Sequence, residues 1–179
     1  MGAVLADGAG TVLGEGRNRR FAGRVRGLLA HAEMEALGVL PPDKQRARDC
    51  VLYTTLSPCP MCFGAIVVAR LGRVHIGALD PTWHGIENMP DLNDEVRRRW
   101  PRIQGPLPGP IGTWLAVAPC WNTAGALLRA MERTAPGTAA LARAVDRRYR
   151  ECADLPGTAV EALENAWDLV SVHSAAGRG

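Results

Sequence analysis

Short β-type runs alternate with helical patterns over the first 77 residues, and this order constrains the fold more than any other feature of the chain. An apolar run around a Gly-rich turn comes first, and β-branched runs then alternate with amphipathic ones. Strands that alternate with helices indicate a three-layer α/β/α arrangement. The predicted strands are residues 3–6, 11–14, 51–55 and 73–77, and the predicted helices are residues 30–40 and 60–71.

Proline and glycine mark the ends of the two predicted helices. Pro41 and Pro42 end the first, because proline lacks a backbone donor and disfavours helix at the residue before it. Pro60 suits the first turn of the second helix, and Gly72 is expected to close it.

The second half of the chain predicts a loop and a helical region. Residues 80–112 are rich in Pro and Gly, with one helical patch at residues 94–100, and long loops of this kind often line functional sites. Trp114–Ala118 is interpreted as a fifth strand. Helical patterns then cover residues 123–134, 138–152 and 158–172. We therefore expect a catalytic domain over residues 1–122 and a helical extension over residues 123–179, packed on the core.

Composition excludes some classes of protein. The 179 residues are 47% apolar and 22% charged, which suits one globular domain with an added C-terminal piece. A net charge of +3 is weak support for a polyanionic partner. No run approaches the roughly 18–20 apolar residues of a membrane helix, and the first residues do not resemble a signal peptide. We therefore expect a cytoplasmic protein without a membrane partner. The five cysteines, an odd number, then argue against a disulfide framework.

The residues with the clearest chemistry are His31-Ala32-Glu33 and Cys59-Pro60-Met61-Cys62. Cys59 and Cys62 are three residues apart at the start of a helix, so their sulfurs share one face, and the helix N-terminus favours thiolates. With His31 they make three ligands for one Zn²⁺ per chain and leave a fourth tetrahedral position for water, as in catalytic zinc sites. Glu33 lies close by and is free to move protons as a general acid and base. H-x-E followed by P-C-x-x-C is the known signature of zinc deaminases.

The Cys pair has two other interpretations, a structural zinc site and a redox dithiol. A structural zinc site needs a fourth protein ligand, and no second Cys-x-x-Cys is present. The second interpretation is a redox-active dithiol that follows a strand, as in thioredoxin-like proteins. His75, on an apolar strand, is expected in the core, whereas the remaining cysteines, Cys50, Cys120 and Cys152, are expected to be small buried hydrophobic residues.

Residues 2–77 resemble the cytidine and deoxycytidylate deaminase superfamily, and within it the branch of fungal cytosine deaminases, bacterial guanine deaminases and tRNA adenosine deaminases. Residues 52–59, Leu-Tyr-Thr-Thr-Leu-Ser-Pro-Cys, are similar to the cytosine deaminase motif. Cys59-Pro60-Met61-Cys62, followed by residues 64–66, is closer to guanine deaminases. The tRNA enzymes share the Gly-x-Gly-x-Asn element at residues 14–18 but usually have Glu where Ser57 stands.

The resemblance implies a five-stranded mixed sheet with helices on both faces, and a homodimer. It implies that Asn18 hydrogen-bonds the base and that backbone amides at residues 56–59 help to place the substrate. Ser57 differs between the branches, so it is a further candidate for substrate binding. The loop that carries Trp83 is expected to close over a flat ring. From about Asp80 onward the chain matches no branch closely, so the resemblance supports the chemistry more than the substrate.

Three functions follow from these features. The first is deamination of a small nucleobase or nucleoside, such as cytosine or guanine. The second is deamination of adenosine in tRNA, for which the cluster Arg97-Arg98-Arg99-Trp100-Pro101-Arg102 would contact phosphates while its Trp stacks on a base. A solvated helix end is the alternative interpretation of that cluster. The third is a catalytically idle zinc-fold protein whose C-terminal helices bind a partner.

Overall fold

The computed structural model describes residues 1–20, 27–120, 125–151 and 157–176. The chain divides into two compact units. The first comprises Met1–Gly77 and Trp83–Pro106, and the second comprises Ala78–Thr82 and Leu107–Gly179. Each unit has its own hydrophobic core. The predicted division into a catalytic domain over residues 1–122 and a helical extension over residues 123–179 stays a prediction.

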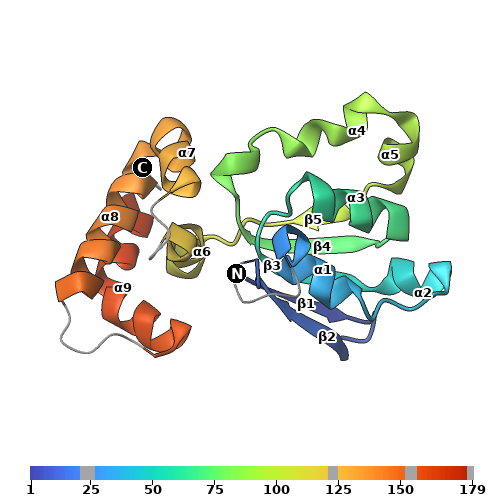
Figure 1. The fold of residues 1–179 in the computed structure, drawn as a ribbon, viewed down its shortest axis with the longest axis horizontal. Coiled ribbons are helices and arrows are strands. Elements are labelled where there is room, and N and C mark those ends of the chain that lie inside the picture. The colour runs from blue at the N-terminus through green and yellow to red at the C-terminus, as the bar shows by residue number, and fades with distance from the viewer. Residues whose placement is uncertain (21–26, 121–124, 152–156, 177–179) are drawn as a thin grey trace. The chain divides into compact units, whose positions relative to one another are not determined.

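A five-stranded sheet forms the framework of the first unit, and its spatial order is β2-β1-β3-β4-β5 (Figure 1). β1 pairs antiparallel with both β2 and β3, whereas β4 and β5 are parallel. The sheet is therefore mixed, which confirms the predicted fold class. The strands are β1 (Gly2–Ala6), β2 (Val12–Arg17), β3 (Val51–Leu56), β4 (Arg73–Ala78) and β5 (Arg102–Gln104).

Helices α1 and α3 pack with the sheet around one core. α1 lies against β1, β2 and β3, and it contacts α3 as well. The core contains Leu5 and Leu52 from the strands, Ala36 from α1, and Phe63 and Ile66 from α3, all at most 2% exposed. The predicted helices on the second face of the sheet stay a prediction. The helices of the first unit are α1 (Ala32–Leu37), α2 (Lys44–Asp49), α3 (Pro60–Ala69), α4 (Met89–Leu92) and α5 (Asp94–Arg99).

Two glycines of β2 let α1 lie directly on the sheet. A Cβ added at Gly16 would be 1.9 Å from the carbonyl oxygen of Ala32, and one added at Gly14 would be 2.4 Å from a methyl group of Val39. Neither position accepts a side chain unless α1 or the residues after it move. The Gly-x-Gly element thus sets the position of the helix that begins next to His31 and carries Glu33.

The second unit is helical, and its helices are α6 (Gly109–Val117), α7 (Ala126–Thr134), α8 (Pro136–Glu151) and α9 (Ala159–Ala176). The last three confirm the helical patterns predicted for the C-terminal third. Tyr149 of α8 is 1% exposed, and its hydroxyl donates to the carbonyl oxygen of Ala162 in α9. Among the described helices, none is both long and apolar enough to cross a membrane.

The predicted fifth strand at Trp114–Ala118 is wrong. Most of this segment lies in α6, where Trp114 and Val117 are buried in the helical core. A short apolar run cannot be assigned to strand or helix by periodicity alone. Pro110 near the start of α6 favours the helix here. The fifth strand is instead β5, three residues paired in parallel with β4.

The end of α3 also differs from its prediction. Arg70, with φ of 60°, adopts the left-handed conformation that was expected at Gly72. Gly72 has another role, because a Cβ there would be 1.9 Å from the carbonyl oxygen of Arg48. The glycine therefore permits a close approach of two backbone segments.

Candidate zinc centre and active site

Two helix starts carry the three candidate zinc ligands. His31 is the N-cap of α1, and Cys59 is the N-cap of α3, immediately after β3. Pro60 at the first helical position fixes a backbone angle suited to this turn. Cys62, in the first turn of α3, is on the same side as Cys59. The two cysteines are buried, and His31 is half-buried.

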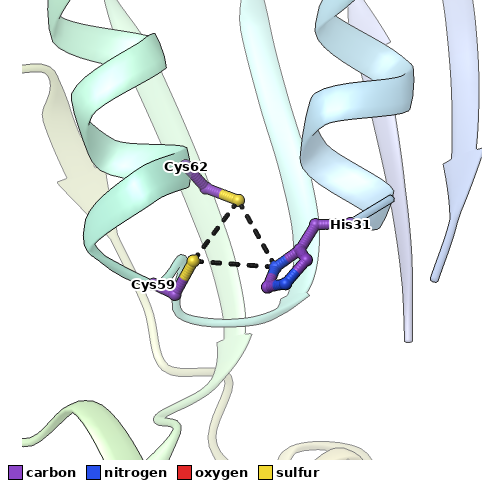
Figure 2. A group of neighbouring side chains, drawn as sticks. All are labelled: His31, Cys59 and Cys62. Carbon is purple, nitrogen blue, oxygen red and sulfur yellow. Dashed lines mark hydrogen bonds between the residues drawn. The ribbon is translucent and has the colours of Figure 1, made fainter. Parts of the chain in front are cut away.

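The three ligand atoms form a nearly equilateral triangle (Figure 2). Sγ of Cys59 and Sγ of Cys62 are 3.6 Å apart, and Nδ1 of His31 is 3.6 Å from each. Tetrahedral zinc, with bonds of about 2.3 Å to sulfur and about 2.0–2.1 Å to nitrogen, separates its ligand atoms by about 3.6–3.8 Å. The triangle therefore fits Zn²⁺ without rearrangement. Within the described part of the chain, this is the one group of three such residues close enough to hold a metal ion.

The surroundings of the two thiols favour one thiolate before any metal binds. The hydrogen bond with Cys62, backbone N–H groups of Met61 and Cys62, and the nearby His31 lower the pKa of Cys59 to about 6. The same hydrogen bond, burial and the carboxylate of Glu33 raise the pKa of Cys62. Cys59 would thus bind a cation as a thiolate, and Cys62 would release its proton on metal binding.

The carboxylate of Glu33 lies beside the triangle and is not part of it. Glu33 is 8% exposed, and its Oε2 is 3.7 Å from Sγ of Cys62. Its Oε1 accepts a hydrogen bond of 2.8 Å from the hydroxyl of Thr54. A buried carboxylate next to a three-ligand metal site is placed to accept and donate protons there.

Asn18 is in a loop tied to the residue before His31. The backbone N–H of Arg19 donates to the carbonyl oxygen of Ala30, and that of Asn18 donates to Met1. Oδ1 of Asn18 accepts from the backbone N–H of Arg20 at 3.0 Å. The loop that carries the candidate base-binding residue is therefore anchored next to a zinc ligand.

The other two candidate substrate residues are in different settings. Ser57 is buried, 6% exposed, and precedes Pro58 and Cys59 at the end of β3. Trp83 ends a short 3-10 turn, Pro81–Trp83, and is 43% exposed. The roles of Ser57 and Trp83 in substrate binding stay predictions.

The Arg-rich segment before Trp100 is engaged in local contacts. Arg97 pairs with Asp94 at 2.7 Å, while Arg98 and Arg99 both pair with Glu95. The ring of Trp100 stacks on Phe63, with centroids 4.8 Å apart and planes at 19°. These contacts agree with a solvated helix end whose Trp packs on the core.

The histidine and cysteines assigned to packing are not members of the triangle. His75 is half-buried and contacts the ring of Tyr53, with centroids 4.8 Å apart. Cys50 and Cys120 are buried free thiols, as predicted, and burial raises the pKa of Cys120 to about 11. Cys152 is outside the described residues.

Sequence reasoning missed two residues that support the site. Thr54 is a buried polar residue on the core-facing side of β3, so a hydroxyl among the alternating apolar residues was the available signal. Glu35 accepts from the backbone N–H of Arg17 at 3.0 Å and pairs with Arg19 at 3.3 Å, which links α1 to the Asn18 loop. Nothing in the sequence pattern distinguished Glu35 from an ordinary helix-surface residue.

Comparison with known proteins assigns the family. Residues 1–78 match the model of the cytidine and deoxycytidylate deaminase zinc-binding region. Residues 1–78 therefore carry the zinc-binding region of this family, with His31, Cys59 and Cys62 positioned as possible zinc ligands.

Named relatives differ in substrate. The chain is 41% identical over 80 residues to the cytosine deaminase of Candida albicans, and the alignment covers 43% of this chain and 51% of that protein. It is 42% identical over 82 residues to the tRNA-specific adenosine deaminase of Haemophilus influenzae, and the alignment covers 45% of this chain and 46% of that protein. It is 36% identical over 111 residues to the tRNA(Ile)-lysidine synthase of Deinococcus radiodurans, and the alignment covers 59% of this chain and 18% of that protein.

A solved structure of a tRNA:A34 deaminase, an enzyme of A-to-I editing at the wobble position, is 30% identical. The match covers 57% of this chain and 75% of that one, with a TM-score of 0.45. The chain spans about half or less of the length of the three relatives named above. The comparisons therefore assign a deaminase family and a zinc-binding region, and these relatives include enzymes of both free bases and tRNA.

Proposed function

We propose that this chain is a zinc-dependent hydrolytic deaminase of a small nucleobase or nucleoside, such as cytosine or guanine. One observation supports the chemistry above all others. His31, Cys59 and Cys62 converge at 3.6 Å, and the carboxylate of Glu33 lies beside them without joining them. A purely structural zinc site has four protein ligands and no use for such a carboxylate.

The residues of the chain divide the work of the reaction. His31, Cys59 and Cys62 hold one zinc ion, which when bound acts as a Lewis acid and makes water a nucleophile at neutral pH. Glu33 takes a proton from the attacking water and delivers it to the ring nitrogen of the substrate. A second proton passes through Glu33 to the amino group, which leaves as ammonia, and the ring carbon keeps the oxygen.

The substrate is held by groups around this centre. With Oδ1 of Asn18 engaged by the Arg20 amide, its side-chain nitrogen is the atom we propose to donate to the base. We propose that Ser57 and the backbone amides at the start of α3 contact the substrate, because the N-terminal turn of a helix stabilises developing negative charge. Trp83 covers the flat ring in this proposal.

A free base or nucleoside is favoured by the state of the Arg-rich segment. The arginines of α5 pair with acidic residues of α4 and α5, and Trp100 is stacked on Phe63. A surface that binds RNA needs cations and aromatic faces open to phosphates and bases. In this segment Arg97, Arg98 and Arg99 are paired with carboxylates and Trp100 stacks on Phe63, while Arg102 is exposed.

The test is an ammonia-release screen on the purified, zinc-loaded chain. The substrates are cytosine, guanine, adenine, their nucleosides and tRNA, with Glu33→Gln as the matched control. We expect release from one class of free base or nucleoside, at least about 100-fold above the control. Release from tRNA alone would reject the small-molecule assignment, and no release from any of them would reject the deaminase.

A second candidate, deamination of adenosine in tRNA, is favoured by the relatives. The longest of the three reported alignments is with a tRNA(Ile)-lysidine synthase, and another is with a tRNA-specific adenosine deaminase. Salt dependence separates the two candidates. Contact with six or more phosphates would lower affinity about 1,000-fold between 50 and 200 mM salt, whereas a neutral base makes no such contacts.

We also propose a homodimer that buries the outer face of α3. The helix is apolar on all sides, and such helices are buried in a core or an interface. One side packs on the sheet, yet Val68 is 74% exposed, and a Cβ added at Gly64 meets no atom within 4 Å. A second copy of the chain is the occupant that the family resemblance suggests.

Replacing Val68 with Glu is expected to convert the dimer to a monomer, because the interface would bury an unpaired carboxylate. The mass in solution, measured by light scattering after size exclusion, checks this. Val160→Glu is the matched control, since Val160 is a 65% exposed valine of α9. A wild-type monomer, or a dimer that tolerates the change, would contradict the proposed interface.

A cytoplasmic location completes the proposal. The cysteines that the structure describes are all free, and Cys59 and Cys62 serve zinc only as reduced thiols. Reducing compartments keep such pairs from oxidation.

A further inference from the structure

Three polar or charged side chains are buried in the described residues, and two of them bind each other. They are Glu33, Thr54 and Ser57, which are 8%, 5% and 6% exposed. The hydroxyl of Thr54 donates to Oε1 of Glu33 at 2.8 Å, across 21 residues of sequence. Because buried polar groups are costly without a partner, this bond fixes how α1 and β3 meet at the site.

The contacts of Glu33 distinguish its two carboxylate oxygens. Oε1 is held by Thr54, and Oε2 faces Sγ of Cys62 at 3.7 Å. The carboxylate group therefore has one oxygen directed toward the strand and one directed toward the zinc ligands. A free carboxylate turns easily about its last bond, since that torsion is broad.

We propose that Thr54 is a positioning residue that anchors Oε1 of Glu33, so that Oε2 stays directed at the metal triangle. This inference rests on the proposed deaminase function. Thr54 needs no contact with substrate for this role. It acts through Glu33 alone.

The surroundings of Thr54 explain why its hydroxyl is suited to this task. Oγ1 is also 3.0 Å from the carbonyl oxygen of Leu56, which follows in the same strand. A hydroxyl has one hydrogen and serves one acceptor at a time, and a bond to a charged carboxylate is the stronger of the two. The branched side chain of Thr has few rotamers, so the hydroxyl is held in place beside Glu33.

Thr54→Val removes the donor and keeps the shape of the side chain. We expect kcat to fall by about 10-fold to 100-fold, the usual effect of losing a partner that orients a group at a metal site. KM and the zinc content should stay within about 2-fold, because neither the ligands nor the substrate contacts change. Thr54→Ser keeps the hydroxyl, and its kcat should return to within about 3-fold of the wild type.

Thr55→Val is the matched control. It removes one hydroxyl from the next residue of β3, on the other face of the strand, where Oγ1 of Thr55 accepts from Gly2. Its kcat should be unchanged. A general loss of stability would lower both valine variants alike, and equal kcat values for Thr54→Val and the wild type would overturn the inference.

Crystal structures of the zinc-loaded wild type and Thr54→Val test the geometry without any activity. We expect the carboxylate of Glu33 to keep one oxygen toward Cys62 in the wild type and to rotate or split into two conformers in the variant. An unchanged, singly ordered carboxylate in the variant would overturn the role of Thr54. Ammonia release absent from the wild type itself would instead refute the proposed function, so the two failures are distinct.

Discussion

Glu33→Gln is expected to lower the rate of ammonia release by about 100-fold to 10,000-fold, the range in which a positioned general acid and base contributes. Gln has the shape of Glu but cannot accept a proton at neutral pH. The side chain is buried, and its Oε2 lies 3.7 Å from Sγ of Cys62, so the substitution acts directly beside the metal triangle.

The zinc content of Glu33→Gln is the second readout of this experiment. It should stay near one ion per chain, because the three ligand atoms form their triangle without Glu33. Glu164→Gln, an exposed carboxylate of α9, is the matched control and should retain full activity. Undiminished activity of Glu33→Gln would reject its role as proton carrier. Loss of zinc together with activity would assign Glu33 to the metal instead.

Cys62→Ala is expected to abolish zinc binding, and with it both activity and part of the stability. Cys62 is fully buried, and its sulfur is 3.6 Å from each of the other two ligand atoms. A metal that binds only the folded chain stabilises it by about 2.7 kcal/mol at a free concentration 100 times its Kd. Because the variant should bind no zinc, its free energy of unfolding should be lower by roughly that amount.

Removing zinc from the wild type with a chelator gives an independent check of this prediction. It should lower the melting temperature of the wild type toward that of Cys62→Ala and leave the variant unchanged, since the two perturbations remove the same interaction. Cys120→Ala is the matched control, because Cys120 is a buried thiol of the helical unit whose pKa is raised to about 11 by burial. It should keep its zinc. Full zinc content in Cys62→Ala would remove Cys62 from the ligand set.

Local sequence signals predicted most of the framework. Alternation and β-branching located β1 to β4, because side chains of a strand alternate between two faces. Helical periodicity located α1, α3 and the three C-terminal helices. The errors occurred where local signals are ambiguous. Trp114–Ala118 suits strand or helix equally, and β5 has three residues, too few to produce a pattern.

The Arg-rich segment shows why charge in a sequence is a poor guide to a partner. Arg97 to Arg99 suggested a phosphate contact, but their partners are Asp94 and Glu95, three or four residues earlier on the same helix. Pairs at this spacing are neighbours on a helix surface. Trp100, which the sequence alone leaves open for stacking on a base, stacks on Phe63 instead.

The alternation of strands and helices and the spacing of His31, Glu33, Cys59 and Cys62 were enough to predict the fold class and the kind of chemistry. Both depend on local rules: the period of each element and the short reach between residues of one helical turn. Tertiary structure alone decided what depends on long-range approach. It brought His31 to 3.6 Å from both sulfurs and placed Thr54 of β3 against Glu33 of α1. It did so because Gly14 and Gly16, having no side chains, let that helix lie on the sheet.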